Sequence, residues 1–278
     1  MARGDSYHDV LTEAINDLAA NGFDSAERVA YWQARLREAA ERTMASTAQM
    51  EEMLRESMAA IYKRLVDNGG LMRAHVGVSR FTVERLRPQM QAELSRRILA
   101  SADLIRLNRK QAIEKTQQRF AGWATSIPAG GSKVVDKRDE KASIKKALSS
   151  LPFEERRVLI DQGHKLTASI NEVVATGSGA IAVRWNSHWR QRGYNYRADH
   201  KERDGKVFLL RSSWARDGGL AKPGPDGYYD EITALAQEPF CRCWGTWLYN
   251  LRDLPKDMLT VKGADALAEA RRKIAEMN

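Results

Sequence analysis

Apolar residues recur at helical spacing through the first 127 residues of the chain. From about residue 24 they return every three or four positions, which keeps one stripe of a helix apolar. Asp24 and Glu27 have the spacing of a capping box and are expected to start this helix. The pair Gly69-Gly70 is expected to end it, because glycine terminates helices. The apolar stripe consists of Val29, Trp32, Leu36, Ala40, Met50, Leu54, Met58, Ile61 and Leu65.

A second helix is predicted from about Arg80 to Ser126, with Pro88 in its first turn, where a proline is tolerated. Two long helices in succession predict a hairpin. A helix of roughly 40 residues is on the order of 60 Å long, which exceeds a compact core and requires a partner. The alternative is that its apolar face is the core of the hairpin itself. The candidate partner-binding face consists of Leu86, Met90, Leu94, Ile98 and Ile105.

The composition changes at residues 128–150, where Pro128, Gly130 and Gly131 are followed by a run of mixed charge. Such a segment is typical of a linker between domains. Beyond it, Ser150 and Pro152 mark the start of another helix, which is expected to reach the turn at residues 177–179. The sequence therefore predicts a domain boundary at 128–150.

From residue 180 the pattern becomes typical of strands. Residues 180–185 and 206–210 are compatible with strands, and Asp204-Gly205 between them is a strong turn signal. Residues 240–244 are also expected to be extended, which would place Cys241 and Cys243 on one face. The predicted fold class is α+β: a long N-terminal helical hairpin or arm (1–127), the linker (128–150), a small mixed helix and antiparallel-sheet domain (151–255), and a C-terminal helix (256–278).

Charge narrows the classes of partner. The chain has 278 residues and a formal net charge of +9, which favours a polyanion such as nucleic acid, with an acidic protein surface as the alternative. No apolar run approaches the roughly 20 residues that a membrane span needs, so no membrane association is expected. The start of the chain lacks the apolar core of a secretory signal, which predicts a cytoplasmic protein.

A basic stretch lies between Arg184 and Arg216, which contains nine Lys or Arg residues and three acidic residues, a local net charge of +6. Tryptophans and tyrosines are interleaved with these cations, so phosphates and bases could be held together. The alternative is that the tryptophans belong to the core and the cations are solvated. The candidate DNA-binding residues are Arg184, Arg190, Arg192, Arg197, Lys201, Arg203 and Lys206.

Cys241, Cys243 and His200 are candidate metal ligands, because two thiolates and an imidazole are donors that zinc prefers. His188 and Asp204 are candidates for further ligands. The alternative is that the cysteines are small buried apolar groups and that His200 lies on the surface.

The same residues also resemble part of an enzyme motif. His200-Lys-Glu202 and Pro239-Phe-Cys241-Arg-Cys243 resemble the signature of zinc-dependent nucleobase deaminases, H-x-E then P-C-x-x-C. One residue rather than two separates the cysteines, and residues 199–206 are expected to form a turn rather than the helix that would present His and Glu together. The sequence therefore favours a protein that is not an enzyme, with the deaminase as an alternative.

Several short motifs occur in an order that resembles the Mu F-like minor head proteins of tailed phages. They are Trp185, Arg197-x-x-His200, Asp204-Gly205 and Cys241-Arg242-Cys243, spread over roughly residues 151–250. The family usually has an aspartate shortly before the arginine and an asparagine directly before the first cysteine. This chain has Tyr194-Asn195-Tyr196 and Phe240 at those places.

The resemblance implies a structural minor head protein of the virion that assists head morphogenesis and DNA packaging or ejection. Its expected partners are the portal protein and the capsid protein, bound by the helical region, with double-stranded DNA as a further partner. It would lie in the host cytoplasm during assembly and then in the capsid interior. The alternative function from the residues is a DNA-binding accessory protein.

Overall fold

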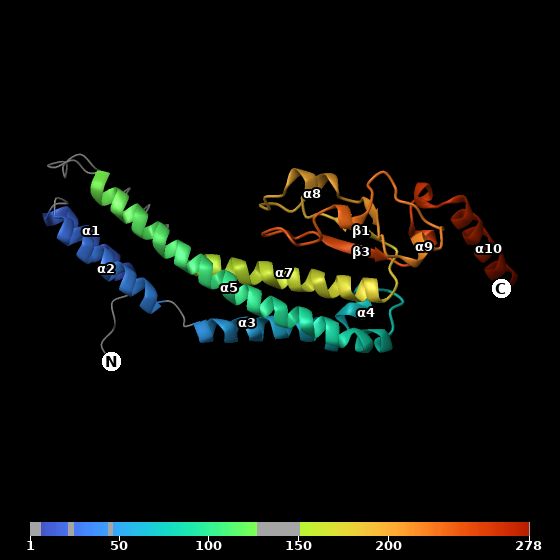
Figure 1. Ribbon diagram of the computed structural model, residues 1–278, viewed down its shortest axis with the longest axis horizontal. Helices are drawn as coiled ribbons and strands as arrows, with labels where there is room; N and C mark the ends of the chain where they lie inside the picture. Colours follow the sequence, from blue (N-terminus) through green and yellow to red (C-terminus); the bar gives the residue numbers. More distant parts are fainter. Residues whose placement is uncertain (1–6, 22–24, 44–46, 127–150, 278) are drawn as a thin grey trace. The chain divides into compact units, whose positions relative to one another are not determined.

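The computed structural model describes residues 7–21, 25–43, 47–126 and 151–277 (Figure 1). The fold is α+β, with long helices and one three-stranded antiparallel sheet, as the sequence predicts. Residues 1–55 and 98–159 form one compact unit, and residues 56–97 and 160–278 form a second. Across the described residues, no helix combines the length and the apolar content that crossing a membrane requires.

The first unit is built on helices α1 (Tyr7–Asn21) and α2 (Ala26–Thr43) and the later part of α5 (Arg80–Ser126). Trp32 donates its indole N–H to Asp17 Oδ2 at 2.6 Å, which ties α2 to α1. The Oγ of Ser25 accepts the backbone N–H of Arg28 at 3.2 Å, so Ser25 is the cap of α2. The expected cap, Asp24, lies outside the described residues. The core of this unit consists of Val10, Leu11, Ala14, Ile15, Leu18, Trp32, Leu36, Ala39 and Phe120.

The expected helix from residue 24 to residue 66 corresponds to α2 and α3 (Thr47–Tyr62), and residues 44–46 between them lie outside the described part. A π-helical turn (Lys63–Asp67) follows α3, and α4 (Gly70–Ala74) begins after Gly69. Gly69 has φ +71°, a left-handed conformation that glycine adopts at little cost, so the predicted helix end is confirmed there.

Helix α5 begins and ends at the predicted residues, but Pro88 lies in its interior rather than in its first turn. Proline has no N–H to donate to the carbonyl of Glu84, four residues earlier, so the helix loses one backbone bond at this point.

The predicted partner-binding face of α5 is largely internal. Leu86 and Met90 are 5% and 0% exposed within the second unit, and Ile105 is 1% exposed within the first. Leu94 and Ile98 are half-buried. Buried residues cannot meet a partner without unfolding their own core, so Leu86, Met90 and Ile105 are internal residues of their units rather than a free docking surface.

The division between the units also differs from the expected one. Residues 56–97 belong to the same compact unit as the C-terminal part of the chain, rather than to a separate arm over 1–127. The reason is packing, because Met58, Leu71 and Met90 are fully buried in this unit. The expected linker, 128–150, lies outside the described residues.

The sheet of the second unit has the strand order β2-β1-β3, with β1 (Ala182–Asn186) antiparallel to both β2 (Val207–Leu209) and β3 (Trp244–Leu248). The predicted strands at 180–185 and 206–210 are confirmed with slightly different ends. Successive residues point to opposite faces of the sheet. One face packs with α7 (Leu151–Gly177), which runs along the sheet in Figure 1, through Val183, Trp185, Phe208, Trp247 and Ala175. The other face carries Ala182, Val207, Leu209 and Leu248.

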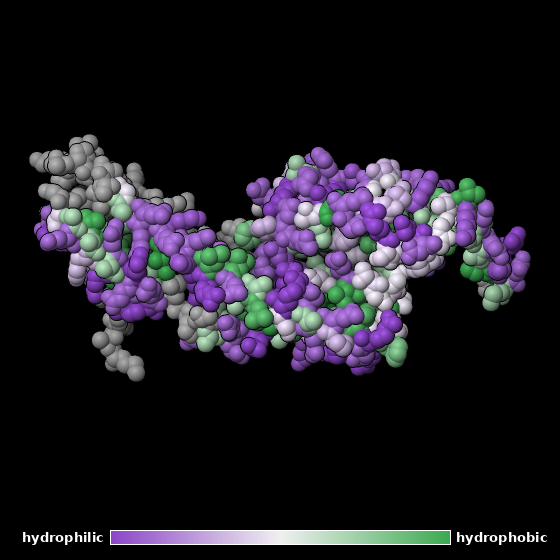
Figure 2. All heavy atoms as spheres, viewed as in Figure 1, coloured by the Kyte–Doolittle hydropathy of each residue, from purple (hydrophilic) through white to green (hydrophobic). Residues whose placement is uncertain are grey.

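The C-terminal helix, α10, spans Val261–Met277, so the predicted helix over 256–278 starts five residues late, after a 3-10 turn at Lys256–Met258. Thr260 caps it, because its Oγ1 accepts the N–H of Gly263 at 3.0 Å. Gly263 is the buried residue of α10, and hydrophobic residues lie on the exposed surface of this helix in Figure 2. Val261 and Met277 are among the exposed residues of α10.

Candidate metal centre

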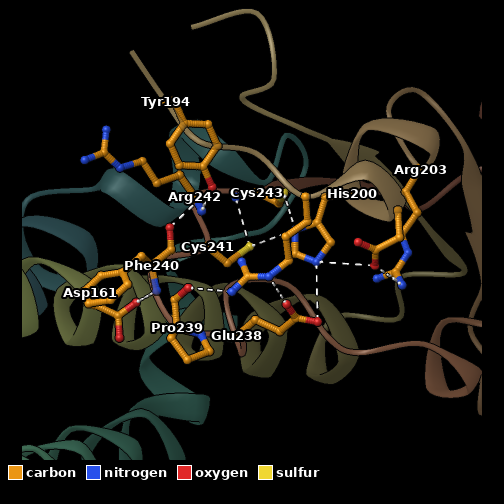
Figure 3. Close-up of polar contacts among 12 residues, drawn as sticks. Asp161, Tyr194, His200, Arg203, Glu238, Pro239, Phe240, Cys241, Arg242 and Cys243 are labelled. Carbon is orange, nitrogen blue, oxygen red and sulfur yellow. Dashed lines mark hydrogen bonds and ion pairs between the residues drawn. The ribbon is translucent and has the colours of Figure 1, made fainter. Parts of the chain in front are cut away.

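His200, Cys241 and Cys243 converge in the interior of the second unit (Figure 3). Nδ1 of His200 lies 3.5 Å from Sγ of Cys241 and 3.4 Å from Sγ of Cys243. With metal–sulfur and metal–nitrogen bonds of about 2.3 and 2.0 Å, a tetrahedral zinc ion separates its N and S ligands by about 3.5 Å. All three side chains are buried. The group therefore has the donors and the spacing to bind a metal ion.

His200 is held by a short helix and by a tryptophan. It lies on α8 (Ala198–Glu202), a single helical turn that replaces the turn expected over residues 199–206. Its ring meets the ring of Trp185 edge to face, with centroids 5.5 Å apart. At 2% exposure it is not a surface residue, which removes the surface alternative. Asp204-Gly205 forms the predicted turn, with Gly205 at φ +81° and its N–H bonded to Trp185 O at 2.8 Å.

The cysteines come from a folded segment before β3, not from a strand as predicted. Phe240 has φ +60°, which an extended residue never has. Asp161 on α7 fixes this conformation, because its Oδ1 accepts the N–H of Phe240 at 2.6 Å. The hydroxyl of Tyr194 lies 3.3 Å from Phe240 O and accepts the N–H of Arg242 at 3.2 Å. Tertiary bonds on both sides therefore turn the two cysteines toward His200.

The two thiols have unequal acidity. The pKa of Cys241 is lowered, because Cys243 donates its S–H to it and because the backbone N–H groups of Cys243 and Ala236 point at its sulfur. The pKa of Cys243 is raised, since it gives the proton to Cys241 and is buried. The Trp185 indole and the Ser187 hydroxyl favour a thiolate at Cys243, and in the described part of the chain neither Trp185 Nε1 nor Ser187 Oγ has another hydrogen-bond partner. One thiolate therefore forms readily, and two further donors are available for a second.

The opposite side of the imidazole faces carboxylates. Nε2 of His200 lies 3.7 Å from Oε1 of Glu238 and 3.8 Å from Oδ2 of Asp199. These three residues make a second group whose atoms are close enough to hold a metal. Each carboxylate already has a cation: Arg197 Nε lies 2.5 Å from Glu238, and Arg203 donates to Asp199 at 2.8 Å.

His188 and Asp204, the candidate further ligands, are not part of either group among the described residues. Asp204 instead accepts the N–H of Ser187 and the indole N–H of Trp189, both at 2.8 Å, and these bonds lower its pKa. Glu202, which would carry protons in a deaminase, is exposed, and Glu238 rather than Glu202 lies beside His200. His200 thus lies on a helical turn, as the histidine of a deaminase would, but Glu202 does not lie beside it in the position that a deaminase requires.

The structure divides the seven candidate DNA-binding residues into two sets. Arg197, Arg203 and Lys206 form ion pairs with Glu238, Asp199 and Asp226 respectively. The other four have exposed side chains, and the Arg190 and Lys201 cations lie 4.9 and 4.7 Å from the centroid of the Trp189 ring. These four are Arg184, Arg190, Arg192 and Lys201.

Sequence reasoning did not single out Asp161, Tyr194 or Glu238. In the sequence, Tyr194 is a departure from the family pattern and one of the aromatic residues of the basic stretch, and Glu238 is an ordinary acid three residues before Cys241. No family model matches this sequence, and comparison with curated proteins and with solved structures finds no match either.

Proposed function

We propose that this chain is a structural minor head protein of a tailed phage, associated with the portal inside the capsid. The observation that supports the proposal is the convergence of motif residues that lie far apart in the sequence. Trp185 contacts His200, Arg197 contacts the segment that carries the cysteines, and the turn at Gly205 is bonded to Trp185. The order of motifs that resembles the Mu F-like proteins thus has a physical basis in one centre.

Zinc is the metal that we propose for this centre. Thiolate ligands select soft or borderline ions, and an imidazole with two thiolates suits zinc. His200 and the cysteines are separated by 41 and 43 positions, so a shared ion would cross-link α8 to the segment before β3. Its role would be to hold these two segments together, which is a structural rather than a catalytic task.

Contact with DNA is a second candidate function, favoured by the exposed cations around Trp189 and by Tyr196, which is 40% exposed. Lysine and arginine bind phosphates, and exposed rings stack on bases. This surface is distinct from the metal ligands, so it fits an accessory that binds DNA within the head.

The presence of zinc is tested by elemental analysis of the purified protein and of the Cys241→Ser, Cys243→Ser double variant. We expect close to one zinc per wild-type chain and none in the folded variant. An absence of zinc in wild-type protein prepared without chelators would leave the cysteines as packing residues.

The role in the head is tested separately, by mass spectrometry of particles from the phage that encodes this chain. Its peptides should be present in purified full particles and in DNA-free heads, at low copy relative to the major capsid protein. Their absence from both kinds of particle would refute a head protein whatever the metal content.

A further inference from the structure

The two candidate metal groups share one residue and use opposite edges of its ring. Nδ1 of His200 points at the thiols, and Nε2 points at Glu238 and Asp199, as Figure 3 shows for the labelled residues. A neutral imidazole has one lone pair and one N–H, so only one of its two edges can serve as a metal ligand at a time.

Charge decides between the edges. Glu238 and Asp199 are each paired with an arginine, and a cation placed between them would meet Arg197 and Arg203 at close range. The side chain of Asp199 is also 49% exposed, so it competes with water. The thiol edge is buried and presents two sulfur atoms within 3.5 Å of Nδ1. The metal therefore belongs on the Nδ1 side.

We propose that Glu238 is the positioning residue of this centre: it accepts the Nε2–H of His200 and thereby fixes the ring as an Nδ1 ligand. The inference rests on the zinc centre of the proposed function. Metal-binding histidines commonly donate their second N–H to a carboxylate, which fixes the tautomer and strengthens the ligand. Among the described residues Nε2 is buried without a hydrogen-bond partner, and Oε1 of Glu238 needs to approach by about 0.5 Å to supply one.

Glu238 is better placed for this task than Asp199. Its two oxygens divide the work, since Oε2 pairs with Arg197 and Oε1 faces His200. In Asp199 the same oxygen, Oδ2, faces His200 and accepts from Arg203. A shared oxygen is a weaker acceptor for the imidazole, so Asp199 serves as the comparison residue.

Arg197 links this carboxylate to the cysteine segment. Its Nε contacts Glu238, and its Nη2 donates to the carbonyl of Pro239 at 3.0 Å, two residues before Cys241. Arg197 itself lies three residues before His200 and is the N-cap of α8. One guanidinium therefore connects the segment that carries the imidazole to the segment that carries the thiols.

The test is zinc affinity, measured by competition with a chromophoric chelator, in four variants of the full chain. Glu238→Gln and Asp199→Asn each remove one charge and keep the shape of the side chain, whereas Glu238→Leu removes the hydrogen-bond acceptor. Arg197→Lys keeps the charge but loses the forked guanidinium that contacts both Glu238 and Pro239 O. Loss of such a partner typically costs roughly 10- to 100-fold in metal affinity. We expect that loss in Glu238→Leu, a smaller loss in Glu238→Gln and Arg197→Lys, and less than roughly threefold in Asp199→Asn.

The second readout is the ¹⁵N resonances of His200 in the zinc-loaded protein, because a purely structural role for Glu238 would not change them. Zinc on Nδ1 with a proton on Nε2 is expected in wild type, and a shifted Nε2 resonance in Glu238→Gln. Zinc on Nε2, or equal affinities in the Glu238 and Asp199 variants, overturns the inference while the zinc centre stands. A wild-type chain that binds no zinc overturns both.

Discussion

The rings of Trp185 and His200 meet edge to face, with their centroids 5.5 Å apart and their planes at 68°. Trp185 comes from β1 and is fully buried, and His200 comes from α8, fifteen positions further along the chain. The contact makes the sheet the support against which the candidate metal ligand is packed. Loss of the indole should therefore affect both the core and the centre.

We predict that Trp185→Ala destabilises the second unit by about 3–5 kcal/mol, the usual cost of truncating a buried tryptophan. Trp214→Ala is the matched control, because Trp214 is 48% exposed and donates one hydrogen bond, to Gly179 O. The control should cost about 1 kcal/mol. Urea unfolding of both variants measures the difference, and equal losses would show that Trp185 is not a central core residue.

The start of α10 depends on a glycine. A Cβ on Gly263 would lie 2.0 Å from the carbonyl oxygen of Leu220, which accepts the N–H of Thr260. Backbone must therefore move to admit even a methyl group.

We expect Gly263→Ala to cost about 1–3 kcal/mol, the range for overpacking. In Gly122→Ala on α5 the added Cβ meets no atom within 4 Å, so this control should gain about 0.5–1 kcal/mol from the helix preference of alanine. Thermal unfolding separates the two. A Gly263→Ala protein as stable as wild type would contradict the close approach.

The helices and the candidate metal centre differ in how far the sequence predicts them. Helix α5 is predicted to its end residues, because its apolar spacing is regular and glycine and proline mark its surroundings. The spacing does not say what covers the apolar face, so the sequence leaves a partner and the protein's own core as alternatives for Leu86 and Met90, which their own unit buries. A periodic pattern predicts burial without predicting the neighbour.

The candidate centre is predicted in its ligands but not in its supports. Residue type identifies His200, Cys241 and Cys243, since few side chains bind zinc. Phe240 adopts a positive φ because of Asp161, 79 positions away, and no local signal announces such a bond. Glu238 likewise becomes notable only when the fold brings it to His200.

His75 should make the free energy of unfolding of the second unit depend on pH. It is 1% exposed, its Nδ1 lies 2.6 Å from the Tyr249 hydroxyl, and its Nε2 lies 2.9 Å from Asn171 Oδ1. Asn171 donates its amide N–H to Thr167 O, so its oxygen accepts the Nε2–H of His75. Burial lowers the pKa of His75 below its usual 6.5.

Because the folded pKa is depressed, the unfolded chain binds more protons below about pH 6.5, and stability should fall as pH decreases through that value. One such group contributes at most about 1.4 kcal/mol per pH unit. His75→Gln should flatten the decline of unfolding free energy between pH 6.5 and 5. Burial also lowers the pKa of His164, so His164→Gln is the comparison that separates the two histidines. An unchanged slope in His75→Gln would show that His75 titrates normally in the fold.

The exposed cations near Trp189 predict that this surface binds DNA. The Arg190 guanidinium lies 4.9 Å from the centroid of the Trp189 ring, and Arg192 follows two residues later in the chain. Both arginines are exposed. Each phosphate contact contributes about 0.9 to the slope of log K against log salt concentration. The Arg190→Glu, Arg192→Glu variant should therefore bind a short duplex more weakly, with a slope reduced by up to about 2.

Arg271→Glu, Arg272→Glu on α10 carries the same change of charge at exposed positions and serves as the control. Fluorescence anisotropy over a salt series measures both variants. A loss confined to the Arg190 and Arg192 variant supports a defined DNA surface at the metal-centre end of the unit. Equal losses would mean that net charge alone attracts DNA, and unchanged binding in both would remove DNA as a partner of these residues.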